Sequence, residues 1–213
     1  MILVLHAENR RKYADVLLQH YRIRHDVYVG ERKWMKLARA DGLERDQFDN
    51  DNALYILAME DNKVVGGSRL IPTLKPHLLS EVFPYLANVR GLPRAHDIYE
   101  WTRVHVVKDR REGRNGGPIA GSIYCGILEF CLAQGISSLT ALVEMWWLPR
   151  FHEMGWELRP LGLPELIEGE WSIAVELPIR PEILVSTREF FGFSNASLMP
   201  PEIFSPREEL ALS

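Results

Sequence analysis

The stretch from residue 97 to residue 107 (DIYEWTRVHVV) constrains the fold of this chain most, because it is a β-strand pattern with opposite charges inside an apolar run. Alternation along a strand predicts one face made of Tyr99, Trp101, Arg103 and His105 and the other made of Glu100, Thr102, Val104 and Val106. A charge buried in a central strand is costly unless it is paired. Glu100 and Arg103 are therefore either functional or part of an ion pair with Arg24 or Arg69.

A basic loop and a helix follow this strand directly. Residues 108–117 (KDRREGRNGG) are rich in arginine and glycine, and Pro118 suits the first turn of a helix that Gly135 can end. The apolar stripe of that helix is Ile119, Ile123, Ile127 and Cys131. The N-terminus of a helix favours an anion, and a strand, a Gly/Arg loop and a helix in this order is how N-acetyltransferase-type folds hold the pyrophosphate of an acyl carrier. A solvated basic loop is the alternative interpretation.

The rest of the chain alternates short strands with helices. We expect a strand at 2–5, a helix capped by Asn9, a long ordered loop or broken helix over 27–52, and a hairpin of strands 53–60 and 64–72. After Gly135 we expect strands at 138–143, near 156–160 and at 171–177, a short helix near 147–154 and a last helix from Pro181. This order predicts an α/β (α+β) layered domain with a mixed, mainly antiparallel sheet.

Composition limits the possible classes of protein. The chain has 213 residues, of which 46% are hydrophobic and 25% charged, so we expect one globular domain over 1–213, with 200–213 as a surface tail. A net charge of -4 argues against a nucleic-acid-binding protein. Cys125 and Cys131 do not share a helix face, and two reduced thiols fit a cytoplasmic protein. The apolar run 2–5 is too short for a signal peptide or a membrane span, so we expect no membrane association.

A polar and aromatic segment near the N-terminus carries the second group of candidate residues. It contains Arg24, Tyr28, Trp34, Asp46, Phe48 and Asp49. Aspartates beside aromatic rings suit a cationic substrate that carries an ammonium and a sulfonium group. Taken singly, each residue also fits a packed core or a solvated turn.

The usual motifs of several other chemistries are missing from the sequence. It has no HExxH, CxxC, P-loop or GxGxxG motif, and Gly66-Gly67-Ser68 is not a GxSxG nucleophile elbow. The seven histidines show no metal-ligand spacing. We therefore expect neither a metal site nor a bound cofactor.

Taken together, these residues resemble the signature of the acyl-homoserine-lactone synthases. The resemblance rests on Arg24, the aromatic residue at 28, Trp34, the run from Asp46 to Asp49, Arg69 and the pair Glu100-x-x-Arg103. It continues through residues 144–156 (EMWWLPRFHEMGW) and so covers most of the chain. Tyr28 departs mildly from the pattern, because phenylalanine is commoner there.

The resemblance implies an N-acetyltransferase-like three-layer fold and a quorum-sensing product. In that family the amine of S-adenosylmethionine attacks an acyl thioester, and the methionine carboxylate then closes a lactone and expels methylthioadenosine. It implies Glu100 as the base or its orienter, directly or through water, and Asp46 and Asp49 as holding the ammonium end or the loop that covers it. Arg24, Arg69 and Arg103 would position the substrate carboxylate and brace the acidic residues. Tyr28, Trp34 and Phe48 would surround S-adenosylmethionine. Phosphopantetheine and its phosphates would contact Val104, Val106, Lys108, Arg110, Arg111 and Arg114.

The acyl donor is either an acyl-coenzyme A or an acyl carrier protein. The sequence looks closest to the subset of the family that uses branched-chain or aryl acyl-CoA, because Trp101 and Trp146-Trp147 are bulky. The expected acyl pocket consists of Trp101, Thr140, Leu142, Met145, Trp146 and Trp147, and isovaleryl-CoA is the donor we expect. In the alternative interpretation these tryptophans only pack the core. The sequence does not predict an oligomeric state.

Three other functions fit part of the sequence. An N-acetyltransferase acting on a different amine with acetyl-CoA would need the basic loop but not the residues between Arg24 and Asp49. A binding module without chemistry would be expected to lack Glu100 or the aspartates, and all are present. A transcription regulator would be expected to carry a helix-turn-helix segment, and we find no convincing one.

Overall fold

The computed structural model describes residues 1–113 and 116–198, and it has the expected layered architecture. The strands are β1 (Ile2–Leu5), β2 (Leu54–Glu60), β3 (Lys63–Pro72), β4 (Ile98–Val106), β5 (Ser138–Glu144), β6 (Arg159–Pro160), β7 (Glu165–Ile167) and β8 (Glu170–Pro178). The helices are α1 (Ala14–His25), α2 (Leu78–Glu81), α3 (Gly117–Ala133), α4 (Leu148–Glu153) and α5 (Pro181–Phe191). Short helical turns lie at η1 (Asp26–Glu31), η2 (Met35–Leu37), η3 (Pro84–Ala87), η4 (Lys108–Arg110) and η5 (Met145–Trp147).

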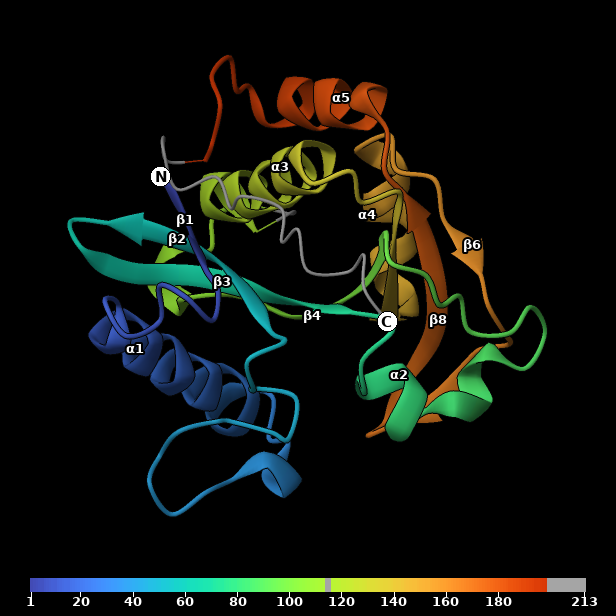
Figure 1. The fold of residues 1–213 in the computed structure, drawn as a ribbon, viewed down its shortest axis with the longest axis horizontal. Helices are drawn as coiled ribbons and strands as arrows, with labels where there is room; N and C mark the ends of the chain where they lie inside the picture. Colours follow the sequence, from blue (N-terminus) through green and yellow to red (C-terminus); the bar gives the residue numbers. More distant parts are fainter. Residues whose placement is uncertain (114–115, 199–213) are drawn as a thin grey trace, which may run out of the picture.

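The strands form a mixed sheet with helices on both faces. Its order is β1-β2-β3-β4-β5-β8-β6, and β7 pairs with β8 beside β6. Every pair is antiparallel except β4 with β5. Helix α1 covers one face, and α3 with α5 behind it covers the other (Figure 1). The mixed, mainly antiparallel sheet and its helical layers confirm the predicted fold class.

The two parallel strands separate along their length. β4 and β5 are paired only from Ile98 with Ser138 to Glu100 with Thr140. Beyond these residues β5 continues beside β8 and β4 continues beside β3, so the middle of the sheet opens into two arms. An opening in the centre of a sheet leaves side chains from both arms free to surround a ligand.

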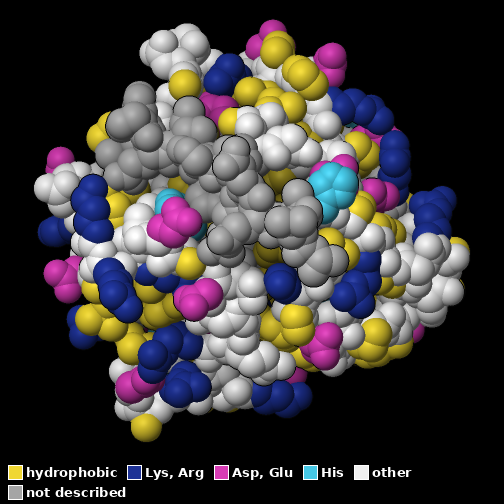
Figure 2. Space-filling model, in the orientation of Figure 1, with side chains coloured by type: hydrophobic (Ala, Val, Ile, Leu, Met, Phe, Trp, Pro, Cys, Tyr) yellow, Lys and Arg dark blue, Asp and Glu magenta, His cyan; other side chains and the backbone are white. Residues whose placement is uncertain are grey.

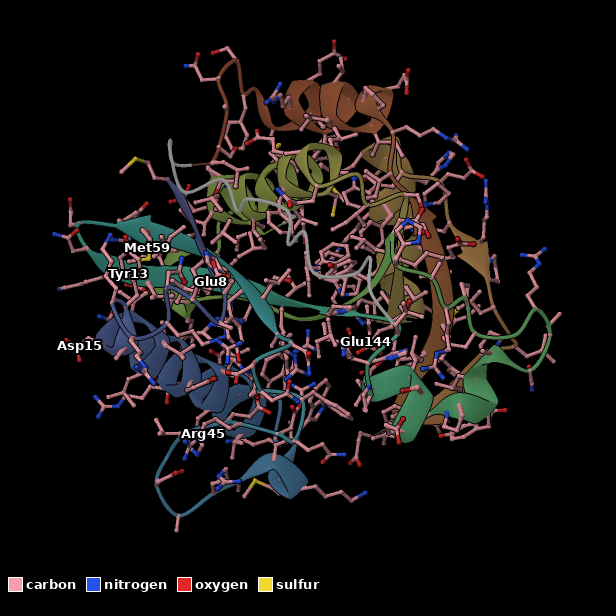
Figure 3. All side chains as sticks on the ribbon, viewed as in Figure 1. Glu8, Tyr13, Asp15, Arg45, Met59 and Glu144 are labelled. Carbon is pink, nitrogen blue, oxygen red and sulfur yellow. The ribbon has the colours of Figure 1, made fainter. Side chains whose placement is uncertain are left out.

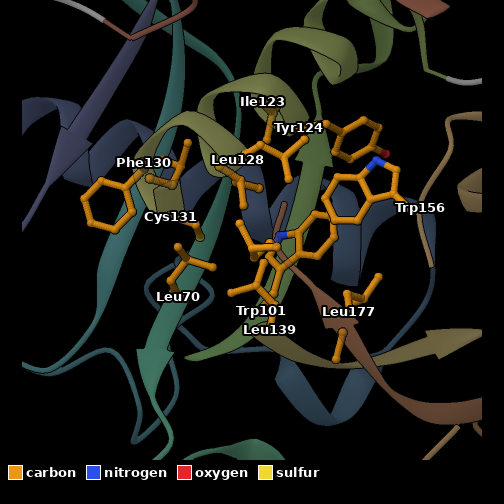
Figure 4. Packing of buried hydrophobic residues seen from close by; sticks show 14 of the residues in the cluster. Leu70, Trp101, Ile123, Tyr124, Leu128, Phe130, Cys131, Leu139, Trp156 and Leu177 are labelled. Carbon is orange, nitrogen blue, oxygen red and sulfur yellow. The ribbon is translucent and has the colours of Figure 1, made fainter. Parts of the chain in front are cut away.

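The main hydrophobic core lies between the sheet and α3. Its members include Leu70, Tyr124, Leu139, Trp156 and Leu177, which interlock beneath the helix (Figure 4). A smaller cluster under α1 contains Leu5, Tyr55 and Phe48 among its members. The two faces of the sheet therefore have separate cores, and each holds one set of helices in place.

The predicted alternation along β4 is wrong beyond Thr102. Arg103 has a φ of 59°, in the left-handed region, and the β3–β4 register shifts between Gly67 and Arg69. This bulge reverses the phase of the strand. Trp101, Val104 and Val106 consequently pack with the α3 core, while Arg103 and His105 lie on the α1 face with Glu100 and Thr102.

The N-terminal helix begins later than the sequence suggests. Asn9 does not cap α1, because its side chain closes the turn after β1: Oδ1 accepts from the His6 N–H and Nδ2 donates to the Val4 carbonyl. The helix starts at Ala14. The short elements α2, η3 and β7 were not predicted, since runs of three or four residues carry no readable period.

Both cysteines are free thiols in the interior. Cys125 and Cys131 are buried, and burial raises the pKa of Cys125 to about 12.

Within residues 1–113 and 116–198, no helix is both long and apolar enough to cross a membrane. The face drawn in Figure 2 carries Lys and Arg interspersed with Asp and Glu. The predicted surface tail at 200–213 lies outside the described residues.

Candidate functional site

A cavity of about 410 Å³ occupies the opening between the two arms of the sheet. Trp101–Val104 of β4 and Ala141–Glu144 of β5 form its opposite walls. The remaining walls come from the segment 28–48, from α2 and the residues after it, from α3 and α4, and from the β7–β8 hairpin. The elements that surround the cavity are far apart in the sequence, and the open sheet brings them together.

The polar end of the cavity is backed by a buried network of three arginines and three carboxylates. Its members are Arg24, Arg69, Arg103, Glu44, Asp46 and Asp49. Arg24 donates to both oxygens of Asp49 at 2.7 and 2.9 Å, and Arg69 donates to both oxygens of Asp46 at 2.6 and 3.0 Å. Such bidentate pairs fix both partners in orientation as well as distance.

The same network is balanced in charge and linked end to end. Arg69 Nη1 also lies 3.0 Å from Asp49, so it joins the two bidentate pairs. Arg103 Nη2 reaches Asp46 at 2.9 Å and Glu44 at 3.1 Å, and Glu44 returns to Arg24 Nε. With as many carboxylates as guanidinium groups, no buried charge is left without a partner.

Electrostatics keep the inner carboxylates ionised despite their burial. Burial by itself raises the pKa of Asp49, but Arg24 and Arg69 outweigh it and hold the pKa of that carboxyl well below its usual range. Burial also opposes ionisation of Glu44, and Arg103 and Arg24 lower its pKa overall. Of the six members, only Asp46 and Arg103 line the cavity, so the other four act as the support that orients them.

Two stacked aromatic rings form the wall next to this network. Tyr28 and Trp34 are parallel within 20° with their centroids 5.2 Å apart, and Arg32 lies over both rings. The Tyr28 hydroxyl donates to the Val104 carbonyl at 2.7 Å, and burial raises the pKa of Tyr28 to about 12, so it stays protonated at neutral pH. Phe48 also lines the cavity. An aromatic wall beside carboxylates provides a surface that attracts cations.

An ion pair links this aromatic segment to the far arm of the sheet. Arg32 donates to Glu144 at the end of β5, and Glu144 is labelled in Figure 3. Lys36 forms a second pair with Glu168 at 2.7 Å in the β7–β8 turn. All four side chains line the cavity, and neither Glu144 nor Arg32 was among the predicted site residues.

Glu100, the predicted base or its orienter, binds the backbone at the start of α2. It is fully buried, and its oxygens accept the backbone N–H groups of Leu78 at 2.9 Å and Leu79 at 2.6 Å, at the start of α2. It is not among the cavity-lining residues, whereas Leu78 is. Burial raises the pKa of Glu100, and it forms no ion pair with Arg24 or Arg69. The carboxylate therefore fixes α2 against β4.

The predicted acyl-pocket residues divide into two groups. Trp101, Leu142 and Trp147 line the cavity, together with Tyr124 and Phe151, which were not predicted. Thr140, Met145 and Trp146 do not line this cavity, and their place in the acyl pocket stays a prediction. Thr140 is buried where β4 and β5 are still paired, Met145 packs against the α3-side core, and Trp146 stacks on Trp147 and is 40% exposed.

Two arginines of the basic loop after β4, Arg110 and Arg111, form ion pairs with carboxylates of other segments. Arg110 pairs with Glu60 at 2.9 Å, and Arg111 pairs with Glu31 at 2.6 Å and donates to the Val106 carbonyl at 2.7 Å. Val104 lines the cavity, but Val106 packs in the core, and Lys108, Arg110 and Arg111 do not line it. Arg114 lies outside the described residues. A phosphate-binding role for this loop stays a prediction.

Sequence reasoning missed Glu44 and Thr102 in the network. Glu44 is fully buried, and the Thr102 hydroxyl accepts from Arg69 Nε at 3.1 Å. Glu44 stands two positions before Asp46 in the charged segment, and the predicted site already had three carboxylates for its three arginines, so the sequence carried no signal for a further one. In the part of the chain that the structure describes, no three His, Cys, Asp or Glu side chains are grouped to hold a metal ion.

A pair of buried histidines lies behind the network. The rings of His20 and His105 are 5.0 Å apart, and within the described residues neither nitrogen of His20 has a hydrogen-bond partner. Burial, His105 and Arg24 lower the pKa of His20 well below its usual value of 6.5, and burial lowers the pKa of His105 to about 4. Both rings are therefore neutral in the folded protein.

Comparison with known proteins agrees with this geometry. Residues 8–185 match the autoinducer synthase family. The chain is 50% identical over 184 residues to the isovaleryl-homoserine lactone synthase of Bradyrhizobium diazoefficiens, covering 86% of this chain and 82% of that protein. It matches the structure of BjaI, a CoA-dependent acyl-homoserine lactone synthase with SAM and isopentyl-CoA, with a TM-score of 0.87 and 47% identity over 92% of this chain and 91% of that one.

A more distant structure bears on the fold alone. An acyl-CoA N-acyltransferase from Pseudomonas aeruginosa matches with a TM-score of 0.54 and 15% identity over 83% of this chain and 97% of that one. The likeness confirms the expected N-acetyltransferase type of fold.

We expect Glu44→Gln to destabilise the protein by about 3–5 kcal/mol, because it leaves the buried arginines with one carboxylate too few. The measurement is the free energy of unfolding in urea. Asp41→Asn, in the same segment but half exposed, is the control and should change it by less than about 0.5 kcal/mol. A loss under about 1 kcal/mol for Glu44→Gln would contradict the charge-balance argument.

We expect His20→Phe to flatten the pH dependence of stability. A histidine whose folded pKa lies below 6.5 contributes stability that is complete above pH 6.5 and is lost as the pH falls toward the folded value. The variant should therefore lose less stability than the unmodified protein as the pH falls from 7 to 5. His152→Gln, at an exposed position, is the control. Parallel stability curves for His20→Phe and the unmodified protein would rule out a neutral His20.

Proposed function

The chain belongs to the autoinducer synthase family, and we propose that it makes an acyl-homoserine lactone from S-adenosylmethionine and a short branched acyl-coenzyme A. The observation that carries the proposal is the 50% identity to an isovaleryl-homoserine lactone synthase over most of both chains. The likeness to BjaI, whose structure contains SAM and isopentyl-CoA, supports the same substrates. Since S-adenosylmethionine and acyl-CoA are cytoplasmic metabolites, the proposed enzyme works in the cytoplasm.

The two ends of the cavity suit the two substrates. S-adenosylmethionine carries an ammonium and a sulfonium group, and Asp46 with the Tyr28–Trp34 wall offers a carboxylate and ring faces to such cations. The amino acid carboxylate suits a guanidinium, and Arg103 is the network arginine that lines the cavity. A compact branched acyl group suits the aromatic end, where Trp101, Tyr124 and Phe151 restrict the depth of the pocket.

The proposed chemistry has two steps. The neutral amine of S-adenosylmethionine attacks the thioester carbon, the C–S bond breaks, and coenzyme A leaves as the thiolate while nitrogen loses its proton. The methionine carboxylate then attacks its own γ-carbon, and methylthioadenosine leaves with the electrons of the C–S bond. Neither step changes an oxidation state, so no redox cofactor is part of the proposal.

Removal of the ammonium proton does not require a strong base. The α-amino group of a peptide N-terminus has a pKa near 7.7–8.0, and the electron-withdrawing sulfonium brings the amine of S-adenosylmethionine toward that range, so on the order of a tenth of it is neutral at pH 7. The main task of the site is then to orient the amine against the thioester. Glu100 acts in this proposal as a positioning residue, because its oxygens are taken by the N–H groups of Leu78 and Leu79.

The experiment that tests the proposed function is a turnover assay with the purified full chain, S-adenosylmethionine and a panel of donors. Mass spectrometry would follow the lactone and methylthioadenosine. We expect lactone from isovaleryl-CoA at a higher kcat/KM than from straight-chain or acetyl donors. Lactone from acyl carrier protein thioesters alone would overturn the proposed donor, and acylation of another amine by acetyl-CoA without lactone would overturn the proposed reaction.

The role of Glu100 has its own test. Glu100→Gln replaces a carboxylate oxygen by an amide that meets a backbone N–H donor to donor, which costs about 1–3 kcal/mol and loosens α2. We expect KM for the acyl donor to rise roughly ten-fold, while the acid limb of the pH profile of kcat/KM stays in place. Glu81→Gln, at the exposed end of α2, is the matched control. Loss of the acid limb in Glu100→Gln would identify Glu100 as the base instead.

A further inference from the structure

A buried hydroxyl contacts the aromatic end of the cavity from behind. Ser68 of β3 is fully buried, and its Oγ accepts a hydrogen bond from Trp101 Nε1 at 2.5 Å. The same Oγ donates to the Thr102 carbonyl at 3.3 Å. The hydroxyl is thus satisfied as acceptor and donor in a region that is otherwise apolar.

Trp101 is the side chain of this group that a ligand would meet. It lines the cavity while only 3% exposed. Its ring stacks on Trp156 with the centroids 5.6 Å apart and meets Tyr124 and Phe151 edge-on at 5.9 Å each. Figure 4 shows Trp101 between the strands and Trp156, beneath α3.

Ring packing alone does not fix the orientation of an indole. The torsion between Cβ and the ring has two broad minima, and ring contacts tolerate either of them. The bond to Ser68 is directional, because the indole has a single N–H donor and no acceptor. Among the described contacts of Trp101, the Ser68 hydroxyl therefore selects the orientation of the ring.

Ser68 also occupies the position that sets the bulge in β4. Gly67 pairs with His105 and Arg69 pairs with Thr102, so Ser68 alone faces the two residues Arg103 and Val104. A bulge leaves backbone groups outside the ladder, and the Ser68 hydroxyl satisfies one of them at Thr102. One small side chain thus contacts both the bulge and the indole.

We propose that Ser68 is a specificity-determining positioning residue, which sets the depth of the acyl end of the cavity by fixing the indole of Trp101. The proposal rests on the proposed function and extends it, because it assigns acyl selectivity to a residue that does not line the cavity. A residue that acts only on the fold would affect all acyl donors alike. A residue that fixes one wall affects donors according to how far their acyl groups reach.

Ser68→Ala tests the proposal with acetyl-, isovaleryl- and hexanoyl-CoA as donors. The indole N–H loses its partner, and we expect the preference for isovaleryl-CoA over hexanoyl-CoA, as a ratio of kcat/KM values, to fall about ten-fold. KM for S-adenosylmethionine should stay within about two-fold, because the bonds from Arg103 to Glu44 and Asp46 still hold the polar end in place. Ser68→Thr retains a hydroxyl and should restore most of the preference.

A double-mutant cycle with Trp101→Phe separates wall positioning from a general structural effect. Phenylalanine has no N–H, so Ser68→Ala should leave the donor preference of the Trp101→Phe enzyme unchanged. Ser138→Ala is the control, because this buried hydroxyl at the start of β5 bonds Glu176 of β8 and does not line the cavity. An equal drop for every donor, or the same shift in both backgrounds, would overturn the proposal.

Failure of the proposed function would give a different result. If the unmodified protein makes no lactone from any donor, the proposed function is wrong. That result says nothing about whether Ser68 positions the Trp101 wall of the cavity. Calorimetric dissociation constants of the same three acyl-CoA compounds would then test the wall directly. We expect Ser68→Ala to reduce the ratio of the largest to the smallest of these dissociation constants about ten-fold. An unchanged ratio would overturn the role of Ser68.

Discussion

Arg103 occupies the left-handed region of backbone space in the middle of β4, opposite Ser68 of β3, and the layout of the site depends on this bulge. A left-handed residue other than glycine costs about 1–2 kcal/mol, so something must hold it. Its guanidinium does so by binding Glu44 and Asp46 on the α1 face. Without the bulge, Arg103 would follow Trp101 onto the α3 face and would be buried there without a carboxylate.

The bulge and the ion network stabilise each other. The network needs a third guanidinium to balance Glu44, Asp46 and Asp49, and only a phase change in β4 brings Arg103 to the correct face. In return, bonds from Arg103 to two carboxylates hold the strained backbone. Buried ion pairs rarely add much stability over an apolar core, but they fix geometry, and here they fix the segment 44–49 against the sheet.

Much of the fold and part of the site follow from sequence, and the exceptions have physical causes. Periodicity gave the hairpin, α3 and most strands, and the resemblance brought Arg24, Trp34, Asp46 and Asp49 together, as the structure does. The phase of β4 was not predictable, because it depends on a φ angle that tertiary ion pairs hold in place. The partner of Glu100 is the start of a four-residue helix, which has no sequence period. Arg110 and Arg111 pair with carboxylates that are 50 and 80 positions away in the sequence. The charges next to them in the sequence could not predict these pairs.

The two ends of the cavity are built from different kinds of interaction, so they differ in which substitutions they tolerate. The polar end depends on a closed set of charges, so changing any one member leaves another buried and unpaired. The aromatic end depends on ring packing, where substitutions of similar volume are tolerated. Ser68 lies between these ends and touches both, through the backbone beside Arg103 and through the indole of Trp101. Changes of acyl group can therefore arise at the rings, or at Ser68 through the indole, while the ion pairs of Arg103 keep the polar end in place.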